Sequence, residues 1–156
     1  MKKILIATGG TGGHVTPAKI IHDLIKSEFE IFYSTDLRGL KYLSPKESKI
    51  FIIDTPKLNF DLFFPIKLIK LMYLILRSIL YLKKKNIEKV ISVGGYMSIP
   101  IIVAAKILRL TVLLLEPNIV LGRSNKFFLN FSQKILCYFD QLYNFPKKYT
   151  QKIEFV

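Results

Sequence analysis

The chain has 156 residues, and its 24 Lys and Arg residues outnumber its 11 Asp and Glu residues, which gives a formal net charge of +13. Hydrophobic residues make up 51% of the chain, which excludes a disordered protein and suits one domain with a substantial core. No nucleic-acid-binding motif accompanies the charge, so we predict no nucleic-acid partner and consider anionic ligands and membranes instead. The single cysteine, Cys137, cannot form an internal disulfide, which is typical of a reducing compartment.

Apolar strands alternate with helical segments along the chain. Near-continuous apolar strands separated by helices predict an α/β fold, in which helices cover both faces of a parallel sheet. Ligands of such sheets bind beyond the carboxyl ends of the strands. The expected strands are residues 2–7, 30–34, 50–54, 89–93, 111–115, 134–138 and 153–156, and the expected helical segments are 17–26, 36–43, 65–85, 98–108 and 121–131.

A glycine-rich stretch follows the first strand: Gly9, Gly10, Thr11, Gly12, Gly13 and His14. Glycines let the backbone approach a ligand closely, and free N–H groups at the start of the next helix favour an anion such as a diphosphate. Thr16 is expected to cap that helix and Pro17 to occupy its first position. Because Val15 stands where a dinucleotide fingerprint needs its third glycine, and no P-loop lysine follows, neither nucleotide motif fits. A purely structural glycine turn is the alternative.

His14 is expected at the mouth of a site formed by three loops. A neutral imidazole can accept a proton from a sugar hydroxyl near physiological pH, although a histidine that only hydrogen-bonds the loop fits the sequence equally well. Residues 94–98 follow the fourth expected strand, and residues 116–118 follow the fifth. Parallel strands bring these loops to the same edge of the sheet, which predicts a single site there.

The expected helix over residues 65–85 combines basic and apolar side chains on one face at 100° per residue. This pattern favours a helix that lies on an anionic bilayer, with basic groups at the headgroups and apolar side chains below them. The alternatives are a core helix with a solvated lysine edge and a dimerisation helix. Its longest uncharged run, residues 71–76, is far shorter than the roughly 20 apolar residues that span a membrane. The predicted membrane patch comprises Phe63, Phe64, Ile66, Lys67, Lys70, Tyr73, Leu74, Arg77, Tyr81 and Lys84.

These motifs together resemble those of the MurG family, the N-acetylglucosaminyltransferases of bacterial peptidoglycan synthesis. The resemblance covers essentially the whole chain, and it implies a Rossmann-like domain that is one half of a GT-B glycosyltransferase fold. It is carried by the glycine-rich stretch with His14, by Gly94, Gly95, Tyr96, Ser98 and Pro100, and by Glu116, Asn118, Gly122, Asn125 and Lys126.

The resemblance implies transfer of GlcNAc from UDP-GlcNAc to the C4 hydroxyl of MurNAc in lipid I, with inversion, at the cytoplasmic face of the inner membrane. Lipid I and the anionic inner-membrane surface would be the partners of this chain, and His14 and Glu116 its catalytic residues. No cofactor and no metal are expected. The implied acceptor- and diphosphate-binding residues are Gly9, Gly10, Thr11, Gly12, Gly13, Gly94, Gly95, Tyr96, Ser98, Asn118 and Asn125.

Two departures from the family pattern qualify this interpretation. The third loop usually reads His-Glu-Gln-Asn, but here Leu115 and Pro117 flank Glu116, and Pro117 removes a backbone donor. The chain also stops where the UDP-GlcNAc-binding half would begin, so residues 1–156 are expected to form the acceptor domain only. A fragment, a split-gene product and a degraded gene all fit the sequence. The alternative function is a non-catalytic, membrane-recruiting subunit that presents a lipid-linked sugar to a separate catalytic chain.

Overall fold

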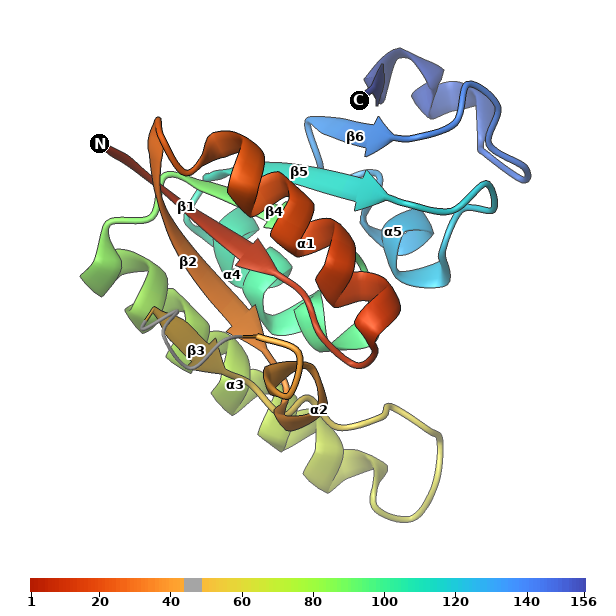
Figure 1. The fold of residues 1–156 in the computed structure, drawn as a ribbon. Coiled ribbons are helices and arrows are strands. Elements are labelled where there is room, and N and C mark those ends of the chain that lie inside the picture. Colours follow the sequence, from red (N-terminus) through yellow and green to blue (C-terminus); the bar gives the residue numbers. More distant parts are fainter. Residues whose placement is uncertain (44–48) are drawn as a thin grey trace.

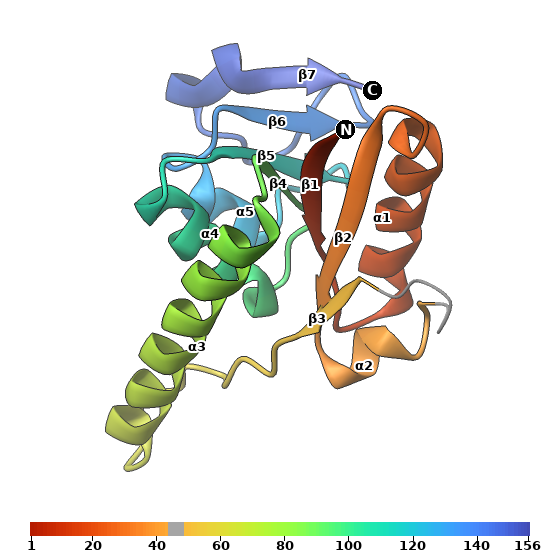
Figure 2. The same cartoon turned by 90° about the vertical axis from the view of Figure 1, so that its left-hand side faces the viewer.

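A computed structural model of the chain describes residues 1–43 and 49–156. The described residues form one parallel sheet in the order β3-β2-β1-β4-β5-β6-β7, with helices on both faces (Figures 1 and 2). The strands are β1 (Lys2–Ala7), β2 (Phe29–Thr35), β3 (Ile50–Ile52), β4 (Lys89–Ser92), β5 (Thr111–Glu116), β6 (Lys134–Cys137) and β7 (Ile153–Phe155). The helices are α1 (Gly12–Ile25), α2 (Leu37–Leu40), α3 (Phe64–Lys85), η1 (Tyr96–Ser98), α4 (Ile99–Ile107), α5 (Arg123–Phe128) and η2 (Lys147–Lys152).

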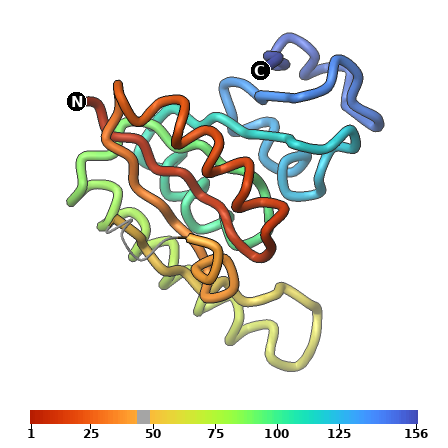
Figure 3. The backbone as a smooth tube through the Cα atoms, viewed as in Figure 1, coloured from red at the N-terminus to blue at the C-terminus, as the bar shows by residue number. Residues whose placement is uncertain are grey.

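The predicted fold class is confirmed, because every described strand pair is parallel and the sheet is covered on both sides. α1 covers one face, and α3, α4 and α5 cover the other (Figure 2). The chain path in Figure 3 shows the loops after β1, β4 and β5 at the carboxyl edge of the sheet. Two core layers result, one on each face, and buried strand residues such as Leu5 and Ile6 point to opposite layers.

The start of α1 differs from the sequence prediction. Thr11 occupies the N-cap position with an extended backbone, and its carbonyl accepts hydrogen bonds from the N–H groups of His14 and Val15. The helix therefore begins at Gly12, and the predictions of Thr16 as cap and Pro17 as first residue are wrong. Pro17 lies inside α1, where its missing N–H removes one bond close to the helix start.

α3 packs on the sheet through a stripe at helical spacing, which comprises Leu71, Leu74, Ser78 and Leu82. Leu74 is only 4% exposed, so its assignment to the membrane patch is wrong. Tyr81 is half-buried, because its ring stacks on Phe51 with centroids 4.1 Å apart, and it also turns inward rather than outward. The 100° periodicity correctly placed both residues next to the basic side chains Lys70, Arg77 and Lys84 around the helix. It did not show that the sheet covers this side of the helix.

The side of α3 that faces away from the sheet is also apolar. We call this surface the α3 apolar stripe; each of its residues has at least 58% of its surface exposed. Lys70, Arg77 and Lys84 are exposed along one flank. In the loop before the helix, Phe60 is 92% exposed. The α3 apolar stripe consists of Ile66, Ile69, Met72, Tyr73, Leu76 and Leu80.

The first turns of α3 extend beyond the sheet (Figure 2). α3 also begins at the end of the molecule toward which the arrowheads of β1 and β2 point (Figure 1). The helix start and the loops at the carboxyl edge therefore lie at the same end. Among the described residues, we find no helix with the length and hydropathy that crossing a membrane requires.

The two faces of α3 predict a large loss of stability for one leucine and almost none for another. Leu74→Ala should lower the free energy of unfolding by about 2–5 kcal/mol, because it removes a buried side chain and leaves a cavity. Leu76→Ala should change it by less than about 0.5 kcal/mol, because Leu76 is already exposed. Urea unfolding followed by circular dichroism measures both values, and equal losses would contradict the assignment of the two faces.

Candidate functional site

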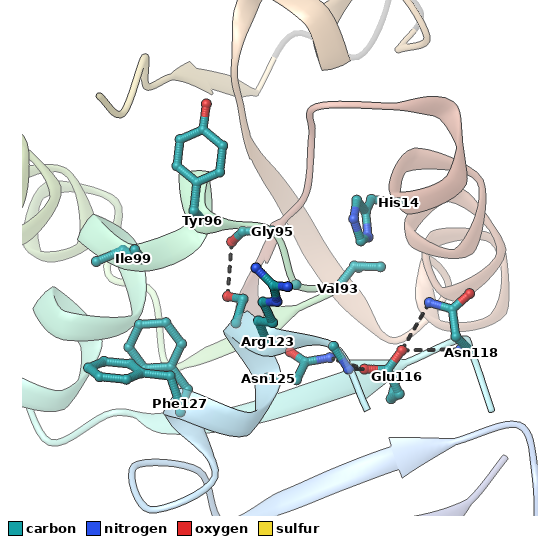
Figure 4. A pocket seen from close by; sticks show the side chains of 14 residues that line it. His14, Val93, Gly95, Tyr96, Ile99, Glu116, Asn118, Arg123, Asn125 and Phe127 are labelled. Carbon is teal, nitrogen blue, oxygen red and sulfur yellow. Dashed lines mark hydrogen bonds between the residues drawn. The ribbon is translucent and has the colours of Figure 1, made fainter. Parts of the chain in front are cut away.

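A cavity of about 450 Å³ opens at the carboxyl edge of the sheet, between the loops that follow β1, β4 and β5 (Figure 4). The structure thus brings together residues that lie more than 100 positions apart in the sequence. Ser98, Thr11 and the glycines at positions 9–13 are not part of the cavity wall, although the sequence places them in the same motifs. The predicted site residues that line the cavity are His14, Gly94, Gly95, Tyr96, Glu116, Asn118 and Asn125.

The first glycine loop is held by a buried carboxylate. Oδ1 of Asp36 accepts hydrogen bonds from the N–H groups of Gly10 (2.9 Å) and Gly39 (2.8 Å), and Oδ2 accepts from Nε and Nη2 of Arg38. Gly9 and Gly10 have φ values of +151° and +81°, which residues other than glycine rarely adopt. Asp36, in the turn between β2 and α2, therefore fixes the conformation of the first glycine loop.

Asp36 has a pKa below its ordinary value. Burial alone would raise the pKa, but the hydrogen bonds from Gly10, Gly39 and Arg38 stabilise the ionised carboxylate and outweigh that effect. The sequence analysis expected the N–H of Gly10 to bind an anion. This N–H instead donates to Asp36 and is not free for a ligand. The N–H groups of Gly12 and Gly13, by contrast, have no hydrogen-bond partner among the described residues.

His14 lies in the first turn of α1 and faces the second glycine loop. The Thr8 hydroxyl donates to the His14 backbone carbonyl at 2.8 Å, which fixes the backbone and leaves the ring unconstrained by that bond. Nδ1 of the ring has no hydrogen-bond partner within the described parts of the chain. A Cβ placed on Gly95 would lie 3.9 Å from the ring carbon Cδ2, so the ring and the second loop are close neighbours.

The second glycine loop is held through its carbonyl group. Gly94 and Gly95 both have positive φ, at +96° and +80°. The Gly95 carbonyl accepts hydrogen bonds from the hydroxyls of Ser98 (2.7 Å) and Ser124 (3.1 Å), the latter on α5. The sequence analysis expected Ser98 to bind the acceptor. Ser98 is buried instead, so it supports the loop from behind and does not line the cavity.

Glu116 ends β5 as a buried carboxylate whose acceptor positions are filled. Oε1 accepts from the backbone N–H and the side-chain amide of Asn118, at 3.2 and 3.0 Å. Oε2 accepts from the N–H of Gly122 (2.7 Å) and the amide of Asn125 (3.0 Å). Asn125 also donates to the carbonyl of Leu115. Glu116 thus closes the third loop onto the start of α5.

Sequence reasoning missed several residues of the site. Asp36 and Arg38 could be recognised as a helix start, but the hydrogen bond from Gly10 to Asp36 spans 26 residues and leaves no local signal. Arg123, Ser124 and Phe127 line the cavity from α5, next to a glycine that the family motif contains. Arg123 directly follows Gly122 of that motif, and this position was the one sequence signal for a charged group in the cavity.

Cys137 is not a candidate nucleophile. Burial, with a smaller contribution from the nearby charge of Glu116, raises the pKa of the Cys137 thiol to about 11. The thiol is therefore protonated at neutral pH. The described residues contain no group of three or more His, Cys, Asp or Glu side chains that could hold a metal ion.

Comparison with known proteins identifies the family. The family described as Glycosyltransferase family 28 N-terminal domain matches residues 4–137. The chain belongs to this family. The family 28 match ends at the last residue of β6, so it includes all three loops of the cavity.

Two curated relatives match nearly the whole chain. The UDP-N-acetylglucosamine--N-acetylmuramyl-(pentapeptide) pyrophosphoryl-undecaprenol N-acetylglucosamine transferase of Pelagibacter ubique is 44% identical over 99% of this chain and 44% of its own length. The transferase of the same name from Rickettsia felis is 38% identical over 98% of this chain and 42% of its own length. The resemblance to the MurG family is thereby confirmed, and this family 28 chain spans less than half the length of these relatives.

Solved structures confirm the fold. The crystal structure of MurG from Acinetobacter baumannii superposes with a TM-score of 0.82 at 23% identity, over 100% of this chain and 46% of that one. The UDP-GlcNAc 2-epimerase of Methanocaldococcus jannaschii gives a TM-score of 0.70 at 14% identity, over 100% of this chain and 45% of that one. The predicted half of a GT-B fold is therefore the observed architecture.

The Asp36 contacts predict how stability depends on pH. A lowered pKa in the folded state stabilises the protein above the ordinary carboxyl pKa of about 3.9, and this contribution is lost as the pH falls through the folded-state pKa. Asp36→Ala should lower the free energy of unfolding at pH 7 by about 1–3 kcal/mol, because it leaves buried N–H donors without acceptors. Its stability should then fall less than that of the wild type on acidification.

Urea unfolding at several pH values between 7 and 2 tests this expectation. Asp140→Ala is the matched control, because Asp140 is exposed. Parallel pH profiles for wild type and Asp36→Ala would contradict the role assigned to this carboxylate.

Proposed function

We propose that this chain is the acceptor-binding half of a peptidoglycan glycosyltransferase, which moves GlcNAc from UDP-GlcNAc to the C4 hydroxyl of MurNAc in lipid I with inversion. The observation that carries the proposal is the cavity at the carboxyl edge, which His14 and the second glycine loop line in a family 28 chain. In this proposal UDP-GlcNAc binds to the other half of such an enzyme.

The start of α1 and the two glycine loops suit a diphosphate. The unpartnered N–H groups of Gly12 and Gly13 lie at the positive end of a 14-residue helix, directly before His14. The positive φ values of Gly94 and Gly95 let the backbone come close to a ligand from the other side. In this arrangement the acceptor diphosphate lies between the loops, and the attached sugar lies toward His14.

His14 is the proposed general base. Inverting transfer needs a group that accepts the proton of the attacking hydroxyl, and His14 is the only histidine among the described residues that line the cavity. Glu116, which the family resemblance implied as catalytic, is a positioning residue in this proposal. Both of its oxygens accept hydrogen bonds from neighbouring groups, so neither is available to take a proton from the acceptor.

The α3 apolar stripe is the proposed membrane-contacting surface. Six large apolar side chains are exposed on one side of the helix, with Lys70, Arg77 and Lys84 along its flank. An apolar face bordered by basic side chains suits the surface of an anionic bilayer, which for this function is the cytoplasmic face of the inner membrane. The start of α3 and the cavity lie at the same end of the molecule, so an acceptor anchored in that membrane is within reach.

Binding measurements test the acceptor assignment. The chain should bind a soluble lipid I analogue more tightly than UDP-GlcNAc, and His14→Ala should weaken analogue binding. Isothermal titration calorimetry with both ligands measures the affinities. Binding of UDP-GlcNAc alone would show that the glycine loops form a nucleotide-sugar site and would overturn the proposal.

Catalysis is tested in a chimera, in which this chain replaces the matching 44% of the Pelagibacter ubique transferase. The chimera should transfer GlcNAc to the lipid I analogue, and His14→Ala in the chimera should lower the rate about 100-fold or more. A small loss of rate would instead favour the alternative function, in which the chain only presents the acceptor. Thr16→Ala, an exposed change two residues away, is the matched control.

Membrane binding predicts a third result. The double variant Ile69→Asp/Leu76→Asp should lose co-sedimentation with phosphatidylglycerol vesicles, because it places two charges in the α3 apolar stripe. Leu24→Asp is the matched control, since Leu24 is 73% exposed on α1, which covers the other face of the sheet. Equal binding of the double variant and the control would remove α3 from the membrane-contacting surface.

A further inference from the structure

We infer that Arg123 is the cationic contact for the acceptor diphosphate and determines the preference of this site for a doubly phosphorylated ligand. The inference rests on the proposed function, because it assigns one residue to a ligand that the proposed function introduces. It concerns a side chain that no sequence motif assigned to the site.

Arg123 is the first residue of α5 and lines the cavity. Its side chain is exposed rather than packed in the core. Figure 4 shows the guanidinium directed away from α5, and in this view it lies between Gly95 and His14. Arg123, the second glycine loop and His14 line the same cavity, so one ligand in it can contact all three.

The charge of Arg123 has no partner inside the protein. The side chain of Arg123 makes no ion pair, hydrogen bond or ring contact with any described residue, whereas Arg38 is held by Asp36 through two nitrogens. Arg77 lies over the rings of Phe51 and Tyr73. An arginine that faces a cavity without a counter-ion is available to an anionic ligand.

Arg123 is the only Lys or Arg among the described residues that line the cavity. Glu116 is the only acidic residue there, and its oxygens already accept four hydrogen bonds, so the carboxylate has no acceptor position left for Arg123. The charge of Glu116 remains in the wall, and the guanidinium of Arg123 is the group whose donors can meet a phosphate.

The guanidinium chemistry favours a phosphate over a neutral sugar. Arginine presents its donors in a planar fork that matches two phosphate oxygens at once, and such charge-assisted pairs are stronger than neutral hydrogen bonds. Arg123, in the cavity wall, would contact one phosphate, and a diphosphate that extends past His14 would bring its other phosphate to the N–H groups of Gly12 and Gly13, which lie next to the cavity rather than in its wall.

The experiment compares two ligands that differ only in phosphate. Wild type, Arg123→Leu and Arg123→Lys are titrated with a short-chain lipid I analogue and with the same saccharide-peptide lacking both phosphates. Lys19→Leu is the matched control, because it removes one positive charge from an exposed position that does not line the cavity. Inorganic diphosphate and UDP are then added as competitors of the analogue.

Arg123→Leu should weaken binding of the diphosphate analogue about 10- to 100-fold, and Arg123→Lys should weaken it less. Binding of the phosphate-free ligand should not change, and Lys19→Leu should behave like wild type. Inorganic diphosphate should compete with the analogue in the wild type and only weakly in Arg123→Leu. UDP should compete no better than inorganic diphosphate if the site recognises the diphosphate alone.

The possible failures are distinct. If the wild type binds the diphosphate analogue and Arg123→Leu binds it equally well, the role of Arg123 is refuted while the proposed function stands. If the wild type does not bind the analogue, the proposed function fails and the inference fails with it. Thermal unfolding of Arg123→Leu separates loss of contact from loss of fold, and loss of both ligands together would count against a phosphate-specific role.

Discussion

The carboxylate of Asp36 is the interaction on which the site depends. It is buried at the end of β2, and it joins the β2–α2 turn to the glycine loop that follows β1. Two glycines with positive φ have many accessible conformations in isolation, and a fixed acceptor for the Gly10 N–H selects one of them. The position of Thr11 as N-cap, and so the direction of α1 and the place of His14, follows from that selection.

A second buried carboxylate performs the same task on the other side of the cavity. Glu116, at the end of β5, gathers donors from the third loop and from α5, as Asp36 gathers donors from the first loop. The oxygens of both carboxylates accept hydrogen bonds from the protein, so Glu116, although it lines the cavity, has no acceptor position left for a ligand. A strongly basic chain thereby uses two of its 11 acidic residues to shape a site that favours anions.

The parallel sheet and the common position of its loops could be predicted from the sequence, because they depend on apolar periodicity and on where the strands end. The apolar strands gave the parallel sheet, and the loops after β1, β4 and β5 met at one edge because parallel strands end together. The sequence could not predict contacts across long separations, such as Gly10 with Asp36 or Gly95 with Ser124. The errors have the same origin: Ser98 and Leu74 were placed by motif or periodicity, whereas their positions depend on what packs against them.

α3 carries two apolar surfaces on one helix, and their relative angle is fixed by the number of residues between them. One inserted or deleted residue inside α3 turns everything beyond it by about 100°, which would bring charged side chains against the sheet or carry the outer stripe away from its plane. A change of seven residues, close to two full turns, would nearly restore both surfaces. The helix can therefore vary in the identity of its side chains far more freely than in its length, and its length also sets how far its first turns extend beyond the sheet.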